Sequence, residues 1–202
     1  MGYPGMGDPR DTNMLQGTAL RGVQPTDGSG IASFDSLLPG HYDGRTTHIH
    51  AIVYLGATKQ ANNTITGGRA AHIGQIYFDQ SLVTAIDKVA PYSTNRNPVT
   101  QNVNDFLFRA GANGDDPIVR YAFVGSRLDE GVFAWIRFGI DQTQNKRVNP
   151  AAFMTDKGGV MNPTGPVGGG AGGFPGWGGG GGWPRRVVRW ARGRREEMRQ
   201  EE

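Results

Sequence analysis

A group of metal-ligating side chains stands out in the first third of the sequence. Three of the four histidines lie within ten residues of one another, beside a tyrosine and an arginine: His41, Tyr42, Arg45, His48 and His50. On a β-strand, side chains alternate between two faces with a rise of about 3.3 Å per residue, so His48 and His50 face the same way. Two imidazoles placed in this way can bind one ion. The spacing is therefore compatible with a metal site on a strand.

The residues around this histidine pair narrow the type of site. The sequence has no cysteine, so thiolate ligands are excluded and His, Tyr and carboxylates remain. A cupin would carry a glutamate a few residues after the second histidine, whereas residues 51–55 are AIVYL. A metal-dependent amidohydrolase needs more ligands on an α/β barrel, and His72 is the one histidine left. Both classes are disfavoured, and the pair alone is not diagnostic because histidines on exposed strands are common.

Tyr42 is a candidate third ligand. It follows Pro39-Gly40-His41, a turn pattern that can direct the tyrosine toward the strand with the two histidines. A phenolate is a hard anionic donor, and a trivalent iron lowers the phenol pKa from its free value of about 10 more than softer divalent ions do. Ligation by Tyr42 therefore favours Fe(III). The alternative interpretation is that Tyr42 is only an aromatic residue flanking a turn.

The elements that must position these residues are mostly short strands. Apolar and β-branched runs between turn signals predict strands at residues 20–24, 30–38, 48–55, 72–78 and 131–140. The helical spacing of apolar residues at Leu82, Val83, Ile86 and Val89 predicts a helix over residues 79–90, stopped by Pro91. A second short helix is predicted over residues 103–110. This pattern indicates a mainly β chain with antiparallel strands, a sandwich or a barrel, and one or two short helices.

The chain divides into three segments by composition. Residues 1–150 look globular and carry 13 Lys/Arg against 13 Asp/Glu, so the net charge of +3 belongs to the rest. Residues 151–184, rich in Gly and Pro, are predicted to be a disordered linker. Residues 185–202 form a short basic tail that could contact an anionic surface or remain solvated. No apolar run approaches the roughly 20 residues that cross a bilayer, and the chain does not open with a signal-peptide pattern.

Several stretches resemble a known signature. Residues 20–27 (LRGVQPTD) and 39–50 (PGHYDGRTTHIH) look like the signature of intradiol ring-cleavage dioxygenases, and are most similar to the fungal extracellular branch of that family. The likeness continues through residues 72–78 (HIGQIYF), 91–95 (PYSTN) and 135–141, and so covers roughly residues 17–141. The segment from Gly158 onward lies outside it.

The resemblance implies an antiparallel β-sandwich enzyme with non-haem Fe(III), held by two tyrosines and two histidines. Such an enzyme inserts both atoms of O₂ between the adjacent hydroxyl-bearing carbons of a catechol and releases muconic acids. Tyr42 matches the family's second tyrosine, which leaves the metal when substrate binds, and His48 and His50 match its histidine pair. Arg45 matches its active-site arginine, and Gln75 matches a glutamine on the oxygen side of the iron, although a glutamine in a strand is as often structural.

The resemblance also implies partners and a location. The partners are a catechol-type small molecule and O₂, nucleic acid is not needed, and the location is extracellular, with any signal peptide in missing upstream sequence. The family's first tyrosine ligand lies in a G-x-Y-S type segment that this sequence lacks, so we expect a chain truncated close to that ligand. The fourth ligand is then either Tyr3 or a missing upstream tyrosine. The alternative function is a non-catalytic β-sandwich module with a vestigial metal site.

Overall fold

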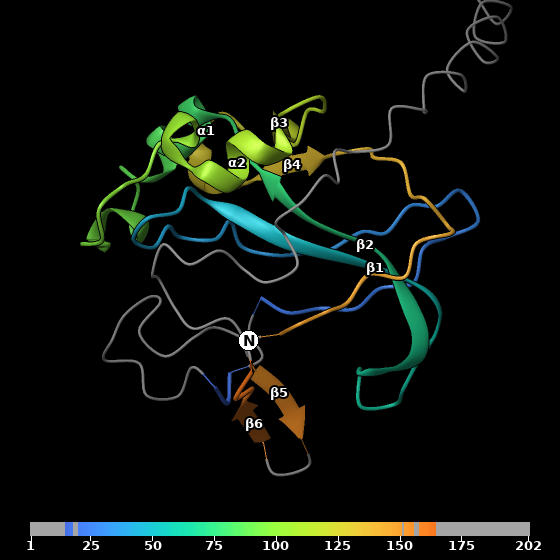
Figure 1. Cartoon of the computed structure of the whole chain (residues 1–202). Coiled ribbons are helices and arrows are strands. Elements are labelled where there is room, and N and C mark those ends of the chain that lie inside the picture. The colour runs from blue at the N-terminus through green and yellow to red at the C-terminus, as the bar shows by residue number, and fades with distance from the viewer. Residues whose placement is uncertain (1–14, 18–19, 151, 156–157, 165–202) are drawn as a thin grey trace, which may run out of the picture.

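A computed structural model describes residues 15–17, 20–150, 152–155 and 158–164 (Figure 1). The described residues form six strands, two α-helices and three short 3-10 helices. In chain order these are β1 (His48–Lys59), β2 (Ile65–Tyr77), α1 (Gln80–Ile86), η1 (Tyr92–Thr94), η2 (Asn102–Asn104), α2 (Phe106–Gly111), β3 (Arg120–Phe123), η3 (Leu128–Glu130), β4 (Val132–Trp135), β5 (Ala152–Thr155) and β6 (Gly158–Met161).

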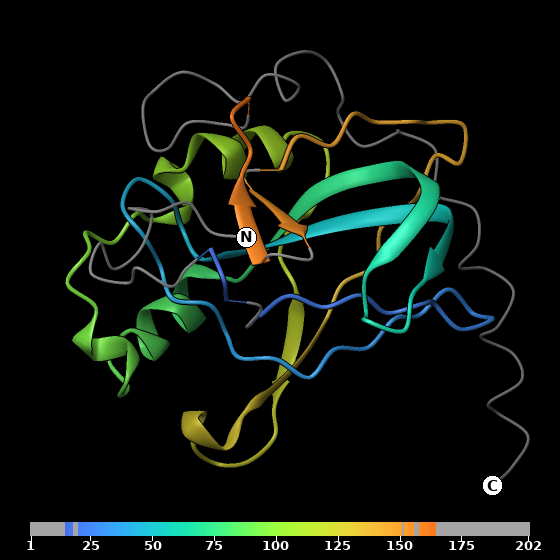
Figure 2. The same cartoon turned by 90° about the horizontal axis from the view of Figure 1, so that it is seen from below.

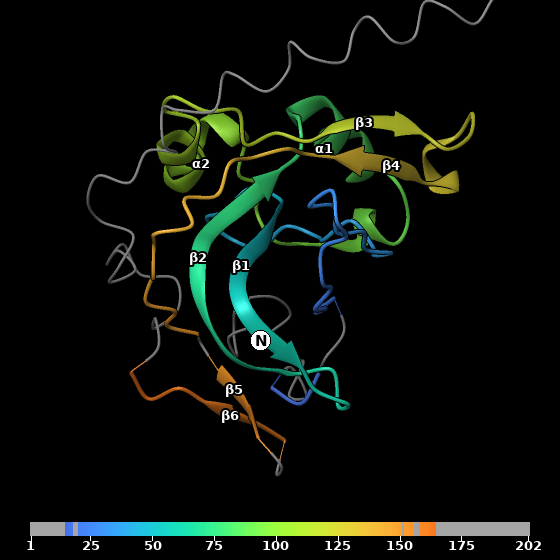
Figure 3. The ribbon, with the colours of Figure 1, turned by 90° about the vertical axis from the view of Figure 1, so that its right-hand side faces the viewer.

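The central element is a long, curved antiparallel hairpin of β1 and β2 (Figure 3). Its register places His48 opposite Tyr77 and His50 opposite Gln75. Because directly opposed residues in an antiparallel pair lie on the same face of the sheet, these four side chains share one face. A β-bulge follows Val53, since Val53 pairs with His72 whereas Tyr54 pairs with Ala70.

Both strands of the hairpin run further than the sequence pattern predicted. The strand expected at residues 48–55 continues to Lys59, and the one expected at residues 72–78 begins at Ile65. Gly68 permits this extension, because it has a φ of +72° and a Cβ there would lie 2.6 Å from the backbone nitrogen of Ala57. The residues near the turn are polar or glycine and do not alternate with apolar residues, so the sequence pattern did not predict them as strand.

Each α-helix begins at an aspartate. The Asp79 carboxylate accepts the backbone N–H of Leu82 at 2.8 Å and caps α1. Asp105 caps α2 by accepting the N–H groups of Leu107 and Phe108. Such caps satisfy N–H groups that have no partner inside the helix. The predicted first helix is confirmed, although it ends at Ile86, and the predicted second one is interrupted because Asp105 is extended and separates η2 from α2.

The apolar core lies where α1 packs against the β3–β4 hairpin and the end of β2. Its buried residues are Phe78, Leu82, Val83, Ile86 and Val119. The backbone joins the same elements, since Tyr77 accepts the N–H of Val119 at 2.9 Å and donates to the carbonyl of Pro117 at 2.9 Å. In Figure 2 the helices lie on one side of the molecule and the turn of the β1–β2 hairpin lies on the other. The core thus supports the end of the hairpin that carries the histidines.

Three predicted strands require correction. Residues 20–24 and 30–38 do not form strands but run as exposed, irregular chain around a turn, in which Asp27 accepts the N–H groups of Ser29 and Ile31. Their apolar residues looked strand-like, but no ladder partner lies beside them among the described residues. The strand expected at residues 131–140 is limited to β4, because β4 pairs with only the four residues of β3, a strand that had not been predicted.

The described chain is mainly β, as predicted, with antiparallel pairing in each of three two-stranded sheets. The face-to-face packing of a sandwich stays a prediction. The hairpin of β5 and β6 falls at the start of the segment predicted to be a disordered linker, and residues 165–184 of that segment and the basic tail lie outside the described residues. Among the described residues, no helix is long and apolar enough to span a membrane.

The core predicts a specific loss of stability for a substitution in α1. Leu82→Ala removes a fully buried side chain, and we expect it to lower the free energy of unfolding by about 2–5 kcal/mol, because lost burial and the cavity add. Thr84→Ala on the exposed face of the same helix is the control, with an expected effect within about 0.5 kcal/mol. Urea denaturation measures both, and equal effects would contradict the placement of the core.

Candidate functional site

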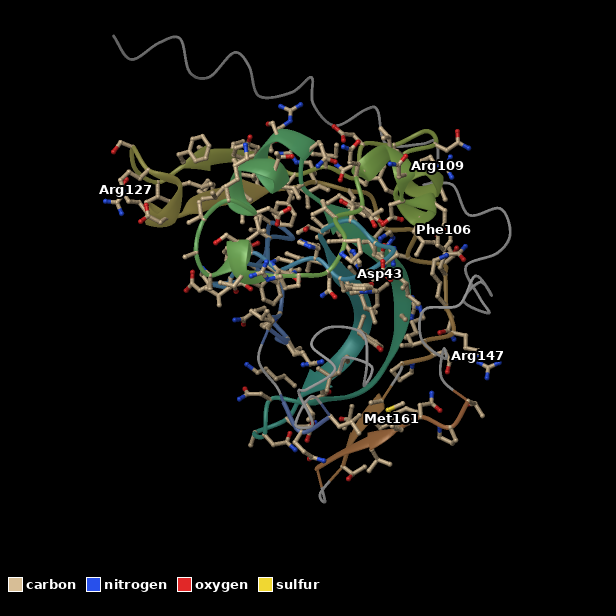
Figure 4. The ribbon with its side chains drawn as sticks, turned by 90° about the vertical axis from the view of Figure 1, so that its left-hand side faces the viewer. Asp43, Phe106, Arg109, Arg127, Arg147 and Met161 are labelled. Carbon is tan, nitrogen blue, oxygen red and sulfur yellow. The ribbon has the colours of Figure 1, made fainter. Side chains whose placement is uncertain are left out.

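The candidate site begins in a tight turn before β1. The N–H of Arg45 donates to the carbonyl of Tyr42 at 3.3 Å, and Gly44 takes a φ of +76°, a conformation that favours glycine. This turn places the Tyr42 and Arg45 side chains next to the first residues of β1. Figure 4 shows the turn, marked by Asp43, on the same side of the molecule as α2, marked by Phe106 and Arg109.

Three of the predicted metal ligands come together in the structure. The Tyr42 hydroxyl lies 3.3 Å from Nε2 of His48, and that nitrogen lies 3.2 Å from Nε2 of His50. Donors bound to one ion at about 2.1 Å and at right angles to each other are separated by about 3.0 Å. The separations of Tyr42 from His48 and of His48 from His50 are therefore both compatible with donors that share one ion.

The tautomer of His48 is compatible with metal ligation. Its Nδ1 lies 2.6 Å from the backbone carbonyl of Thr46, and a carbonyl can only accept, so Nδ1 carries the proton. The lone pair of Nε2 is then directed at Tyr42 and His50. Metal-binding histidines commonly donate their second ring nitrogen to a carbonyl in this way, which fixes the ring.

A metal at this position would need the tyrosine. Within the described ranges, no three or more His, Cys, Asp or Glu side chains are grouped so as to hold an ion, so the two histidines have no carboxylate beside them. Burial raises the pKa of Tyr42, although Arg45 partly opposes the rise, and the side chain is neutral in the metal-free protein. A bound cation would favour the phenolate, and Tyr42 would then supply the anionic ligand.

A buried ion pair lies beside the ligand group. Nε of Arg45 donates to Oδ2 of Asp105 at 2.9 Å, and both side chains are buried. Burial alone would raise the pKa of Asp105, but hydrogen bonds such as that from the Thr46 N–H and the charge of Arg45 keep it below its usual value. Asp105 is therefore a carboxylate, and it compensates a guanidinium that would be costly to bury alone.

The outer nitrogen of Arg45 reaches the opposite strand. Nη2 donates to Oε1 of Gln75 at 2.6 Å and to the Tyr77 hydroxyl at 3.4 Å, and Tyr77 in turn donates to Oε1 of Gln75. Nε2 of Gln75 lies 3.5 Å from Nε2 of His50. Gln75 therefore connects the arginine to the histidine pair, which is a structural role that the sequence comparison left open.

The charge of Arg45 acts on the histidines. Burial is the largest cause that lowers the pKa of His48 to about 3, and Arg45 and His50 lower it further. The pKa of His50 is also lowered, by partial loss of hydration and by Arg45, although its side chain is more exposed than that of His48. Both imidazoles are thus neutral near pH 7, the form that can donate a lone pair to a metal.

The structure separates His41 from this group. Its Nε2 is bonded to the carbonyl of Asn97 at 2.9 Å and its Nδ1 lies 3.2 Å from Asp87, so both ring nitrogens serve the packing of the preceding loop. Sequence analysis did not identify Asp105 or Tyr77 as part of the site. The one sequence feature that pointed to Asp105 was its position before the apolar run of residues 106–108, which is typical of a helix cap. Tyr77 was predicted only as a residue of a strand.

The ring of His48 predicts a pH dependence of the metal-free protein. Its pKa is about 3 in the folded state and about 6.5 in the unfolded chain, so the unfolded state binds more protons between these values and stability falls as the pH falls. We expect the contribution of His48 at pH 5 to be about 2 kcal/mol smaller than at pH 7.5. Urea denaturation with a chelator should give a smaller pH difference for His48→Gln, and an unchanged difference would refute this assignment.

Two solved structures are similar to the chain. One is an intradiol ring-cleavage dioxygenase from Tetranychus urticae, with 29% identity and a TM-score of 0.46 over 56% of this chain and 49% of that one. The other is a dioxygenase, with 29% identity and a TM-score of 0.49 over 60% of this chain and 52% of that one. The chain thus spans about half the length of these two proteins. No family model and no curated protein matches the sequence. The first of these two proteins is an intradiol ring-cleavage dioxygenase, the family that the motifs of this chain resemble.

Proposed function

We propose that this chain carries the iron site of an enzyme that cleaves catechol-type aromatics with O₂ between the two hydroxyl-bearing carbons. Tyr42, His48 and His50 would hold a non-haem Fe(III), and Arg45 and Gln75 would lie beside the substrate. The observation that supports this most directly is the convergence of the three donor atoms, with neighbouring separations of 3.2 and 3.3 Å. The sequence motifs named above support the same reaction class.

The donor set suits this metal. Two neutral imidazoles and one phenolate combine intermediate and hard ligands without any thiolate, which favours iron over softer ions. When bound, Fe(III) would withdraw electron density from a catecholate so that a ring carbon can react with O₂. The fixed tautomer of His48, held by the Thr46 carbonyl at 2.6 Å, keeps its Nε2 available without rearrangement.

Tyr42 has a second proposed role as a base. A catechol must lose its hydroxyl protons to bind as a dianion, and a phenolate oxygen is a suitable acceptor for one of them. In this role the proton moves from the catechol hydroxyl to the hydroxyl oxygen of Tyr42, and the tyrosine becomes a neutral phenol. The half-buried position of Tyr42 stabilises that neutral form, because burial raises its pKa.

Arg45 is proposed to stabilise negative charge on the ring. Its guanidinium is buried and held at Nε by Asp105 and at Nη2 by Gln75, so it is oriented before substrate arrives. A fixed cation costs little reorganisation when charge develops, which is the basis of electrostatic catalysis. Gln75 lies 3.5 Å from His50, and the resemblance is the basis for proposing that its amide borders the oxygen side of the site.

The first experiment is a visible absorption spectrum of the purified chain loaded with Fe(III), with and without catechol. We expect a tyrosinate-to-iron charge-transfer band that shifts when catechol is added, and product analysis should give a muconic acid carrying both atoms of isotope-labelled O₂. Tyr42→Phe should weaken the band by at least about tenfold, because it removes the phenolate donor.

Tyr54→Phe is the matched control, since Tyr54 lies on β1 beyond the bulge and the same hydroxyl is removed outside the site. It should keep the band. If the wild-type chain folds and binds no iron, the proposal for this chain is wrong and the binding-module alternative gains support. A band without ring-opened product would restrict the proposal to metal binding.

A further inference from the structure

The segment from Asn102 to Asp105 contains residues that form hydrogen bonds with the site. It carries two buried polar side chains, and both contact Arg45 or Thr46 across roughly 60 positions of sequence. Neither was recognised as a site residue from the sequence. The segment belongs to η2 and to the cap of α2, so a helical element outside the β1–β2 hairpin is connected to the site by side chains alone.

Asp105 makes four hydrogen bonds with its two oxygens. Oδ2 accepts Nε of Arg45 and the backbone N–H of Thr46, each at 2.9 Å. Oδ1 accepts the N–H groups of Leu107 and Phe108 at 2.8 and 3.2 Å. The side chain is 0% exposed. One oxygen therefore serves the site and the other caps α2, and a single carboxylate joins the helix to the arginine.

Asn102 holds the same turn from a second direction. Its Oδ1 accepts the hydroxyl of Thr46 at 2.6 Å, and its Nδ2 donates to the carbonyl of Phe78 at 2.8 Å. Thr46 is thus fixed at its backbone N–H by Asp105 and at its hydroxyl by Asn102. The carbonyl of Thr46 accepts the N–H of Nδ1 of His48. The orientation of the histidine therefore depends on the same hydrogen bonds that hold Thr46.

We propose that Asp105, assisted by Asn102, is a positioning residue of this site that orients the Arg45 guanidinium and fixes the Thr46 carbonyl behind His48. This inference rests on the proposed function for its effect on catalysis, but the geometry it claims exists in the metal-free protein. Asp105 acts through Arg45 and Thr46, and it is not proposed to touch substrate or metal. Asp105 thereby connects α2 to the Arg45 guanidinium directly and to His48 through Thr46.

Asp105→Asn separates the two functions of the carboxylate. Asparagine is a good helix cap, so its one oxygen can keep the bonds to Leu107 and Phe108. Its amide nitrogen would then face the donors of Arg45 and Thr46, and a donor cannot accept from them. We therefore expect the variant to retain α2 but to release the arginine and the turn.

Asp79→Asn is the matched control. Asp79 caps α1 in the same way, with its carboxylate accepting the N–H of Leu82 at 2.8 Å, and it also accepts the hydroxyl of Ser81, which lies outside the turn of residues 42–46. The two variants therefore make the same substitution at two helix caps. A difference between them at Arg45 and Thr46 reports the bonds of Asp105 to these two residues rather than capping.

The primary measurement is proton exchange in the metal-free protein by NMR, at Nε–H of Arg45 and at the amide of Thr46. Both should be protected in the wild type and in Asp79→Asn, and protection should fall by at least about tenfold in Asp105→Asn, since the loss of a charge-assisted hydrogen bond has effects of that size. The wild-type measurement alone tests the proposal if the variant does not fold. An Arg45 Nε–H that exchanges as fast as those of surface arginines would overturn it.

The catalytic measurement uses the iron-loaded protein with catechol. Asp105→Asn should lower kcat by at least about tenfold, while Asp79→Asn keeps the wild-type value, because misplacing an oriented group costs transition-state stabilisation. A wild-type protein without turnover would contradict the proposed function. The proton-exchange result would then be the test of whether Asp105 holds Arg45 and Thr46 in place. A wild-type enzyme with full activity in Asp105→Asn would contradict the positioning role itself.

Discussion

The antiparallel register of β1 and β2 is the constraint on which the rest of the site depends. It sets His48 against Tyr77 and His50 against Gln75, and thereby collects four polar side chains on one face of a two-stranded sheet. A slip of one residue would turn the histidines to the other face, away from Gln75 and Tyr77. The small core beneath α1 and the pairing of Tyr77 with residues 117–119 hold the end of this hairpin in place.

The buried positive charge of Arg45 is the second constraint on the site, because it requires a nearby anion. Burial is the largest cause that lowers the pKa of His48 and of His50, and the charge of Arg45 lowers both further. The same charge would be unfavourable in the interior without an anion, and Asp105 supplies it from a segment distant in sequence. The Arg45–Asp105 ion pair therefore contributes to the electrostatics of the histidines and also connects the hairpin to the helix.

The sequence predicted the local part of this site well and the distant part poorly. The spacing of Tyr42, His48 and His50 was sufficient to predict that these side chains lie together, because a turn and a strand determine their directions from short-range geometry, while their role as metal ligands stays a prediction. Asp105 and Tyr77 were missed because their roles depend on contacts with residues about 30 to 60 positions away, which no local pattern encodes. Residues 20–24 and 30–38 were wrongly assigned as strands for a related reason, because an apolar run becomes a strand only when another strand lies beside it.

The β-bulge divides the hairpin into an inner part that carries the histidines and an outer part, next to the turn, that can accept insertions more easily. Ala71 is the residue left without a partner between the pairs Val53–His72 and Tyr54–Ala70, so the ladder is locally disrupted at this position. Residues 61–64 at the far turn are exposed. An added peptide at this turn would disturb the outer pairs before it could shift the histidines. The turn is therefore a suitable attachment point for a fluorophore or for immobilising the protein on a surface without perturbing the site.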